Sequence, residues 1–434
     1  MNPQINYLQR YVPHLHDVVK NKHPQLYEKF HPWNQFIISK IDSIENTFSQ
    51  RMAFLIVLRT TWHCKNSSIF NNIVHTCKDR NVFKIGEVEA ICSYKYVLDK
   101  GVNSYKNFFA EFKFLLNAID ELTWIHIITD ETWKAFVDGN WSVQHIFDVI
   151  FTVGHVLLLS MVSNSIESFY PNDNNDTNKE NFYEALRSKI IINNNNKSTT
   201  TSPSLLSSLA SLRVLPLKYG SLPAPRISAL EDESEWTDLL KRMKVARGRV
   251  PQIHKYIARH NELHEAWMVF AAHVATASAT NSLTSSDKEI PIIRVGVLCQ
   301  SPYEYNAHIQ LGAKVGLSNE MLNSPEFKLL YNDEDTDGED NVVKEYEWSD
   351  KHRCMIQGTD ELISNFSLTQ DTLKKLYTNF TNEVSKDDAD KQLIDYVFAI
   401  GQYFLTCLAL NSIGCQTLQN VDMKSENSDW TSRM

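Results

Sequence analysis

The stretch DYVFAIGQYFLTCLALNSI, residues 395–413, has a counterpart in the first half of the chain, DVIFTVGHVLLLSMVSNSI, residues 148–166. The two segments align without a gap at an offset of 247, with Asp, Gly and the closing Asn-Ser-Ile at the same places. The apolar run 145–162, which overlaps the earlier segment, carries His145, Asp148 and His155, so it predicts a buried core helix better than a membrane span.

Two further matches lie upstream of this pair. TDETWK, residues 129–134, matches TQDTLK, residues 369–374, at an offset of 240. SIFNNIVH, residues 68–75, matches SPYEYNAH, residues 301–308, at an offset of 233. Ordered matches with changing gaps indicate a tandem duplication, in which the second copy carries insertions such as the acidic stretch 331–347.

The repeat divides the chain into two predicted helical domains with irregular segments between and after them. We expect the domains at 1–170 and 207–422, a linker rich in Asn, Ser and Thr at 171–206, and a polar tail at 423–434. Within the linker, NFYEALRSKIII is a candidate short helix.

Composition favours an all-α intracellular protein. Glycine is scarce, 13 in 434 residues, and no glycine-rich nucleotide-binding motif occurs. The net charge of −9 argues against a nucleic-acid partner. Seven cysteines without a CxxC motif, and no signal peptide, indicate reduced thiols and a cytoplasmic location without a membrane partner.

The second copy carries a polar constellation in QSPYEYNAHIQLGAKVGLSNEM, residues 300–321. Ser301, Glu304 and His308 are spaced i, i+3 and i+7, which predicts one face of a helix with Ser301 as its N-terminal cap. Glu304 can orient His308, which can transfer a proton near neutral pH, while the helix N-terminus can hold a carboxylate or a developing oxyanion. The alternative is a capped helix with a surface Glu–His pair.

This segment resembles the hallmark of the carboxymuconolactone decarboxylase family, within the alkylhydroperoxidase-D-like (AhpD-like) superfamily. GRVPQIHKYIARHNELHEAW and FAIGQYFLTCLALNSIG resemble that family's N-terminal helices and its last long helix, so the resemblance covers most of 211–418. It implies an all-α fold of two tandem AhpD-like domains that tends to form homo-oligomers.

Redox members of the superfamily carry Cys-x-x-Cys-x-x-x-His, preceded by a Glu. The corresponding positions here are Glu289, Ser301, Glu304 and His308, so both cysteines are replaced and dithiol chemistry at these positions is lost. Cys299 lies two residues before Ser301 but has no partner in the motif.

The resemblance therefore implies acid/base chemistry on a small organic acid or lactone, without a cofactor or metal. In this interpretation His308 is the general acid/base, Glu289 is its partner in the relay and Glu304 tunes it. Ser301, with Arg294, would bind the anion. The alternatives are a non-catalytic binding or assembly protein of the same fold and, second, a peroxidase or thiol oxidoreductase that uses Cys299.

The first copy departs further from the family. Aligned through a two-residue insertion, its hallmark positions are Ser68, Asn71 and His75, and the position of Glu289 is Phe54. Both carboxylates are missing, which indicates a degenerate copy, unless His75 contributes to a shared site. A zinc site needs to be considered because four soft ligands lie close together in the sequence, but their spacing is unusual for zinc. They are His63, Cys64, His75 and Cys77.

Overall fold

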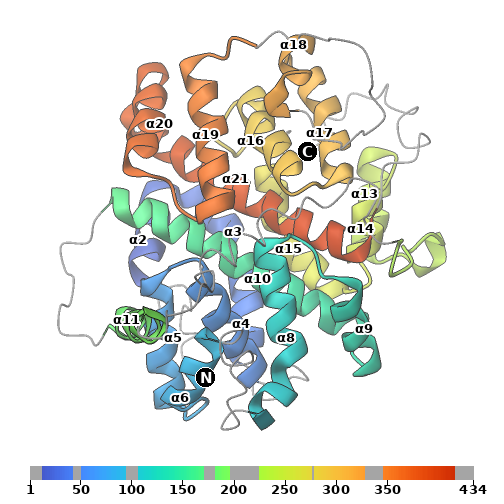
Figure 1. Ribbon diagram of the computed structural model, residues 1–434. Coiled ribbons are helices and arrows are strands. Elements are labelled where there is room, and N and C mark those ends of the chain that lie inside the picture. The colour runs from blue at the N-terminus through green and yellow to red at the C-terminus, as the bar shows by residue number, and fades with distance from the viewer. Residues whose placement is uncertain are drawn as a thin grey trace, which may run out of the picture.

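The computed structural model describes residues 12–42, 50–93, 106–170, 181–195, 224–275, 278–327 and 346–415. Within these ranges every regular element is a helix (Figure 1), so the predicted all-α class is confirmed. The predicted tail 423–434 and acidic stretch 331–347, apart from its last two residues, lie outside the described residues.

The helices fall into two groups of similar order. The first group is α2 (Pro13–Lys22), α3 (Pro24–Asp42), α4 (Gln50–His63), α5 (Ser67–Asp79), α6 (Ile85–Cys92), α8 (Lys106–Trp124), α9 (Asp130–Asp138), α10 (Val143–Val162) and the π-helical turn η2 (Ser163–Glu167). Next comes α11 (Phe182–Asn195). The second group is η3 (Glu233–Glu235), α13 (Asp238–Arg247), α14 (Gln252–Ile257), α15 (Asn261–Val274), α16 (Ser285–Leu298), α17 (Pro302–Lys314), α18 (Asn319–Leu322), η4 (Pro325–Phe327), α19 (Asp350–Asn365), α20 (Gln370–Glu383) and α21 (Lys386–Ile413).

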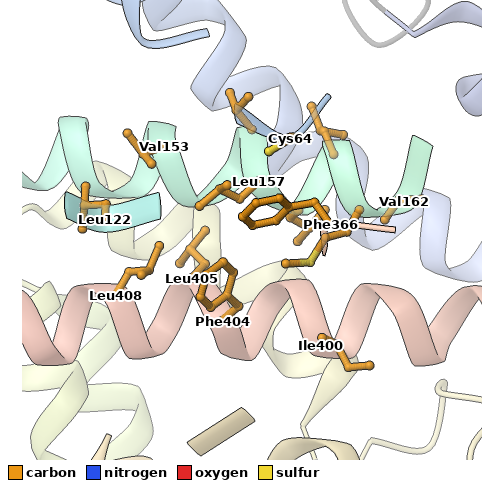
Figure 2. Close-up of a cluster of buried hydrophobic side chains, with 14 of the residues drawn as sticks. Cys64, Leu122, Val153, Leu157, Val162, Phe366, Ile400, Phe404, Leu405 and Leu408 are labelled. Atoms are coloured by element: carbon orange, nitrogen blue, oxygen red, sulfur yellow. The ribbon is translucent and has the colours of Figure 1, made fainter. Parts of the chain in front are cut away.

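The centre of the molecule is the pair α10 and α21, the two matched apolar segments. Ser142 and Ser385 cap their N-termini, each accepting a hydrogen bond from a backbone N–H three residues on. Figure 2 shows Leu157 of α10 facing Phe404 and Leu405 of α21 across the interface. Both helices are long and apolar enough to cross a membrane, but nearly all of their apolar residues are buried inside the structure.

The α10–α21 contact is reciprocal at two glycines. A Cβ atom on Gly154 would lie 2.7 Å from Cγ of Leu405, and one on Gly401 would lie 2.7 Å from Cγ of Leu158. Residues 154 and 158 correspond to 401 and 405 at the offset of 247. The contact of Gly154 with Leu405 is therefore equivalent to that of Gly401 with Leu158, with the two helices exchanged. Such self-complementary pairing is the geometry of a two-fold interface.

Contacts upstream of the central pair also occur twice. The bounds of α4 and α5 become those of α16 and α17 when 235 is added. Two asparagine side chains, 247 residues apart, each donate to two backbone carbonyls, one following α4 or α16 and one following α8 or α19. These are Asn164 to the carbonyls of Cys64 and Phe366, and Asn411 to those of Cys299 and His126.

The two groups of helices share one hydrophobic core among the described residues. Helix α3 packs against α15, and α2 packs against α21. The segment 181–192 forms most of α11, as expected, and this helix buries Phe182 and Tyr183 against the first group. The predicted linker 171–206 therefore contains a docked helix, with Asn71 accepting a hydrogen bond from the backbone N–H of Tyr183 at 2.9 Å.

Candidate functional site

The cluster around His308 is assembled where α16 turns into α17. Gln300 has a φ of 49°, and the N–H of Ser301 donates to the carbonyl of Gly296 at 2.9 Å, which reverses the chain direction. A Cβ on Gly296 would lie 3.1 Å from the backbone nitrogen of Tyr305, so glycine permits the close approach of the two helices. This approach brings Glu289 of α16 to the side chains of α17.

Both ring nitrogens of His308 are held by carboxylates. Nδ1 lies 2.8 Å from Oε2 of Glu289, and Nε2 lies 3.1 Å from Oε2 of Glu304. The ring of Tyr403, on α21, packs edge-on against the imidazole at 4.8 Å between centroids. The side chain of Glu289 is fully buried, whereas those of Glu304 and His308 are 6% and 8% exposed. Glu304 and His308 therefore belong to an interior cluster and are not the surface pair of the alternative interpretation.

The two carboxylates keep His308 protonated. Burial alone would lower the pKa of the imidazole, but the charges and hydrogen bonds of Glu289 and Glu304 outweigh it and raise the pKa to about 10. Burial, together with the same two carboxylates, raises the pKa of the Tyr403 phenol well above its usual range. At neutral pH the cluster thus holds one imidazolium between two carboxylates, beside a neutral phenol.

Ser301 takes the predicted N-cap position of α17, but its side chain makes no capping hydrogen bond. The hydroxyl is fully buried and has no partner with hydrogen-bond geometry. The sequence therefore predicted the N-cap position of Ser301 correctly, but the expected capping hydrogen bond of its side chain is not formed.

Arg294, predicted to help bind an anion, makes its hydrogen bonds away from the cluster. Its guanidinium forms two hydrogen bonds with the carboxylate of Asp360, at 2.7 and 3.0 Å, and a third with the carbonyl of Glu326. Arg59, at an offset of 235, makes the same bidentate pair with Asp120. These arginines fix one helix to another in each half of the chain.

The repeated contacts also correct the predicted register of the first copy. At the offset of 235, the positions of Ser301, Glu304 and His308 are taken by Asn66, Ile69 and Ile73 rather than by Ser68, Asn71 and His75, and no two-residue insertion is present. Ser68 is exposed, and His75 packs edge-on against Phe182 of α11. Asn66 caps α5, with its side chain accepting from the N–H of Ile69.

With this register, the first half has an apolar interior where the second half has the cluster. Phe54, Ile69 and Ile73 stand at the positions of Glu289, Glu304 and His308, and each is at most 2% exposed. No side chain of this trio can carry a proton, so the polar cluster belongs to the second half only.

The four soft ligands weighed for zinc are not brought together. His63 instead pairs with Asp120 at 2.6 Å. Among the described residues, one group has a spacing that could suit a metal ion, namely His23, His273 and Asp395, all buried. Here Nδ1 of His23 accepts the N–H of Leu26, which leaves the proton on Nε2, 2.9 Å from Asp395. A protonated nitrogen cannot be a ligand, so these residues fit a buried ion-pair network better than a metal site.

Sequence reasoning missed three residues at the edge of the cluster. Tyr403 and Cys407 lie on α21, in the segment quoted for its repeat, and His126 follows α8. The backbone carbonyls of His126 and Cys299 both accept hydrogen bonds from the Asn411 side chain, at 3.3 and 2.8 Å. Only the replacement of Ser160 by Cys407 between the two copies could have drawn attention to this place.

Comparisons with family models, with curated proteins and with solved structures gave no match. The resemblance to the carboxymuconolactone decarboxylase family therefore rests on the residues and motifs of the sequence itself.

Proposed function

We propose that the second half of this chain is a cysteine-independent acid/base enzyme of the carboxymuconolactone decarboxylase type, acting on a small carboxylated or lactone substrate. The observation that carries the proposal is a buried His308 held at both nitrogens by Glu289 and Glu304. Buried ionisable groups with strongly shifted pKa values are typical of catalytic sites. In this proposal the chain is a duplicated AhpD-like protein, cytoplasmic and homo-oligomeric, whose first half has lost its site.

The raised pKa sharpens the role of His308. An imidazole that stays protonated at neutral pH is a proton donor, not a general base. Glu289 holds the imidazolium from the closed side. Glu304, on the side that solvent reaches, is the group through which the proton would pass to and from a substrate.

Arg247 takes the anion-binding role that Arg294 cannot fill. It is the last residue of α13 and is half-buried. Its positive charge opposes the rise in the Tyr403 pKa that burial and the two carboxylates cause. The cluster of two carboxylates and one imidazolium has a net negative charge, so a substrate carboxylate needs a cation beside it. Arg247 supplies that charge next to Tyr403.

The test is a screen of small lactones and carboxylic acids, monitored by proton NMR for turnover. His308→Gln should abolish turnover of any substrate found, and Arg247→Gln should raise KM about tenfold or more, the effect of losing one charge-assisted hydrogen bond. Arg242→Gln is the matched control, because Arg242 is exposed on the same helix and should leave KM unchanged. Unchanged turnover in His308→Gln, with the fold intact by circular dichroism, would rule out the assignment.

The non-catalytic alternative is favoured by how little of the cluster is exposed. A buried ion pair can specify packing without catalysing anything. The same screen, read by thermal shift, separates the two functions: an assembly protein would show neither turnover nor stabilisation by any compound.

A further inference from the structure

Two buried oxygen atoms beside the start of α17 have no hydrogen-bond partner among the described residues. One is Oγ of Ser301, at the N-cap of that helix, and the other is Oδ1 of Asn411, on α21. Ser301 is 0% exposed and Asn411 is 1% exposed. Buried polar atoms in folded proteins are nearly always paired, so two unpaired oxygens in one place need an explanation.

The counterparts of these two residues in the first half are bonded to each other. They are Asn66, at the N-cap of α5, and Asn164, in η2. Nδ2 of Asn66 donates to Oδ1 of Asn164 at 2.8 Å. Oδ1 of Asn66 accepts from the backbone N–H of Ile69, also at 2.8 Å. One carboxamide thus supplies an acceptor to the first turn of α5 and a donor to Asn164.

The backbone at the two N-caps is the same, so the difference lies in the side chains. Ser301 has a φ of −100° and a ψ of 96°, and Asn66 has a φ of −86° and a ψ of 91°. The residue before each cap has a positive φ, 49° in the second half and 53° in the first. Serine ends in a hydroxyl where asparagine carries a whole carboxamide. Ser301 is therefore too short to make the contacts of Asn66.

The hydrogen bonds of Asn411 determine what could bind between the two oxygens. Its Nδ2 donates to the carbonyls of Cys299 and His126, so its remaining polar atom is the acceptor Oδ1. A ligand group must donate a hydrogen bond to this atom, which a carboxylate cannot do. The positive end of the α17 dipole disfavours a cation, and Glu304 in the first turn is already paired with His308. A neutral hydroxyl group fits, because it donates and accepts.

We propose that Ser301 Oγ and Asn411 Oδ1 form a hydroxyl-binding subsite at the N-terminus of α17. Water, the smallest hydroxyl donor, occupies it in the free protein, and a hydroxyl group of the substrate displaces that water. The bound hydroxyl does what the carboxamide of Asn66 does in the first half: it donates to the asparagine oxygen and accepts at the start of the helix.

The step from a bound water to a substrate hydroxyl rests on the proposed acid/base function. Ser301 precedes Glu304 by one helical turn, so the subsite lies at the Glu304 end of the cluster. Arg247 would bind the substrate carboxylate, and Ser301 would bind a hydroxyl rather than the anion. The substrate class then narrows to small hydroxy acids and the lactones that open to them.

The first test is a crystal structure of the full-length protein at a resolution that shows ordered water. In the wild type we expect one oxygen within about 2.5–3.0 Å of both Ser301 Oγ and Asn411 Oδ1. In Ser301→Asn the new carboxamide should replace this oxygen and donate to Asn411, as Asn66 donates to Asn164. Asn66→Ser is the matched control, because it should create a second such oxygen position in the first half.

The second test compares the binding of butyrate and of the isomeric hydroxybutyrates by isothermal titration calorimetry. At least one hydroxybutyrate should bind about tenfold more tightly than butyrate, because its hydroxyl keeps the hydrogen bonds of the ordered water and releases that water. Ser301→Asn should abolish this preference and leave the affinity for butyrate unchanged.

Two results would overturn the proposal. A wild-type crystal structure with Ser301 and Asn411 in direct contact, or with no oxygen between them, would rule out the subsite even where a variant fails to fold. If that oxygen is present but no hydroxybutyrate binds more tightly than butyrate, the subsite holds water only and has no part in substrate binding. Neither measurement depends on turnover, so the acid/base function is decided separately by His308→Gln.

Discussion

His308 illustrates how two carboxylates reverse the effect of burial on one imidazole. Nε2 of buried His155 donates to the amide oxygen of Asn34, and burial lowers the pKa of this imidazole to about 3. Burial acts on His308 in the same direction, yet Glu289 and Glu304 raise its pKa to about 10. The two residues are buried in the same protein and differ in the charge of their partners, so charge pairing decides the protonation state here.

The raised pKa predicts a pH-dependent contribution of His308 to stability. The folded protein holds the His308 proton more tightly than the unfolded chain, whose histidine has a pKa near 6.5. The stabilisation is complete below pH 6.5 and is lost as the pH rises to about 10. His308→Gln should therefore lower the free energy of unfolding by about 3–5 kcal/mol at pH 6, as expected when a buried pair is broken. The difference from wild type should shrink toward pH 10 in urea unfolding.

His155→Gln is the matched control for this prediction. Since the pKa of His155 is lowered, its linkage to pH lies between about 3 and 6.5, and the cost of its replacement should be constant above that window. A cost for His308→Gln that is equally constant from pH 6 to 10 would contradict the proposed imidazolium.

Whether a contact of a single residue could be predicted depends on how far apart its two partners lie in the sequence. The period of a helix places Glu304 and His308 on one face, so their contact could be predicted from spacing. The contact between Glu289 and His308 joins two helices and came only from the family resemblance. The partner of Arg294, Asp360, could not be predicted because it lies 66 residues away and no local pattern connects the two.

At the scale of elements, the pair α10 and α21 depends on two glycines whose role a sequence match alone does not explain. The match showed that Gly154 and Gly401 recur, and the structure gives the reason: each faces a leucine of the other helix. In contrast, the register of α5 against α17 was misread by two residues. The sequence alignment matched Ser68 and His75 to an identical Ser and His in the second copy. The true counterparts of Glu304 and His308 are apolar, so nothing in the sequence marks them.

The glycine contacts predict a clear cost for adding a methyl group. In Gly154→Ala, the new Cβ would lie 2.7 Å from Cγ and 3.2 Å from Cα of Leu405, so backbone as well as side chain must move. Such overpacking costs about 1–3 kcal/mol, against the gain of up to about 1 kcal/mol that alanine brings to an ordinary helix. Urea unfolding should show this loss for Gly154→Ala and, by the reciprocal contact with Leu158, for Gly401→Ala.

The partner residue provides the control for that prediction. Leu405→Ala removes the clashing Cγ. The double variant with Gly154→Ala should therefore lose less unfolding free energy than the two single variants lose together. Strict additivity would mean that the methyl group is accommodated elsewhere.

At the scale of the whole molecule, the two predicted domains are linked by more than a connecting segment. His23, between α2 and α3, pairs with Asp395 on α21, and His273 of α15 pairs with the same carboxylate. Burial would raise the pKa of Asp395, but the two histidines lower it well below its usual range. The division of the chain was visible in the sequence as a repeat. The contacts between the two halves were not visible in the sequence, because a repeat has the same pattern whether its copies pack together or apart.

The shared core predicts that the halves do not fold separately. Fragments 1–206 and 207–434, produced alone, would each expose one face of the α10–α21 interface and half of the Asp395 network. A large exposed apolar face destabilises a fragment and promotes aggregation. We expect neither fragment alone to show a cooperative thermal transition by circular dichroism. Co-expressed, they should purify as a one-to-one complex that unfolds cooperatively. A monomeric 207–434 fragment that melts cooperatively by itself would show that the second half has a sufficient core of its own.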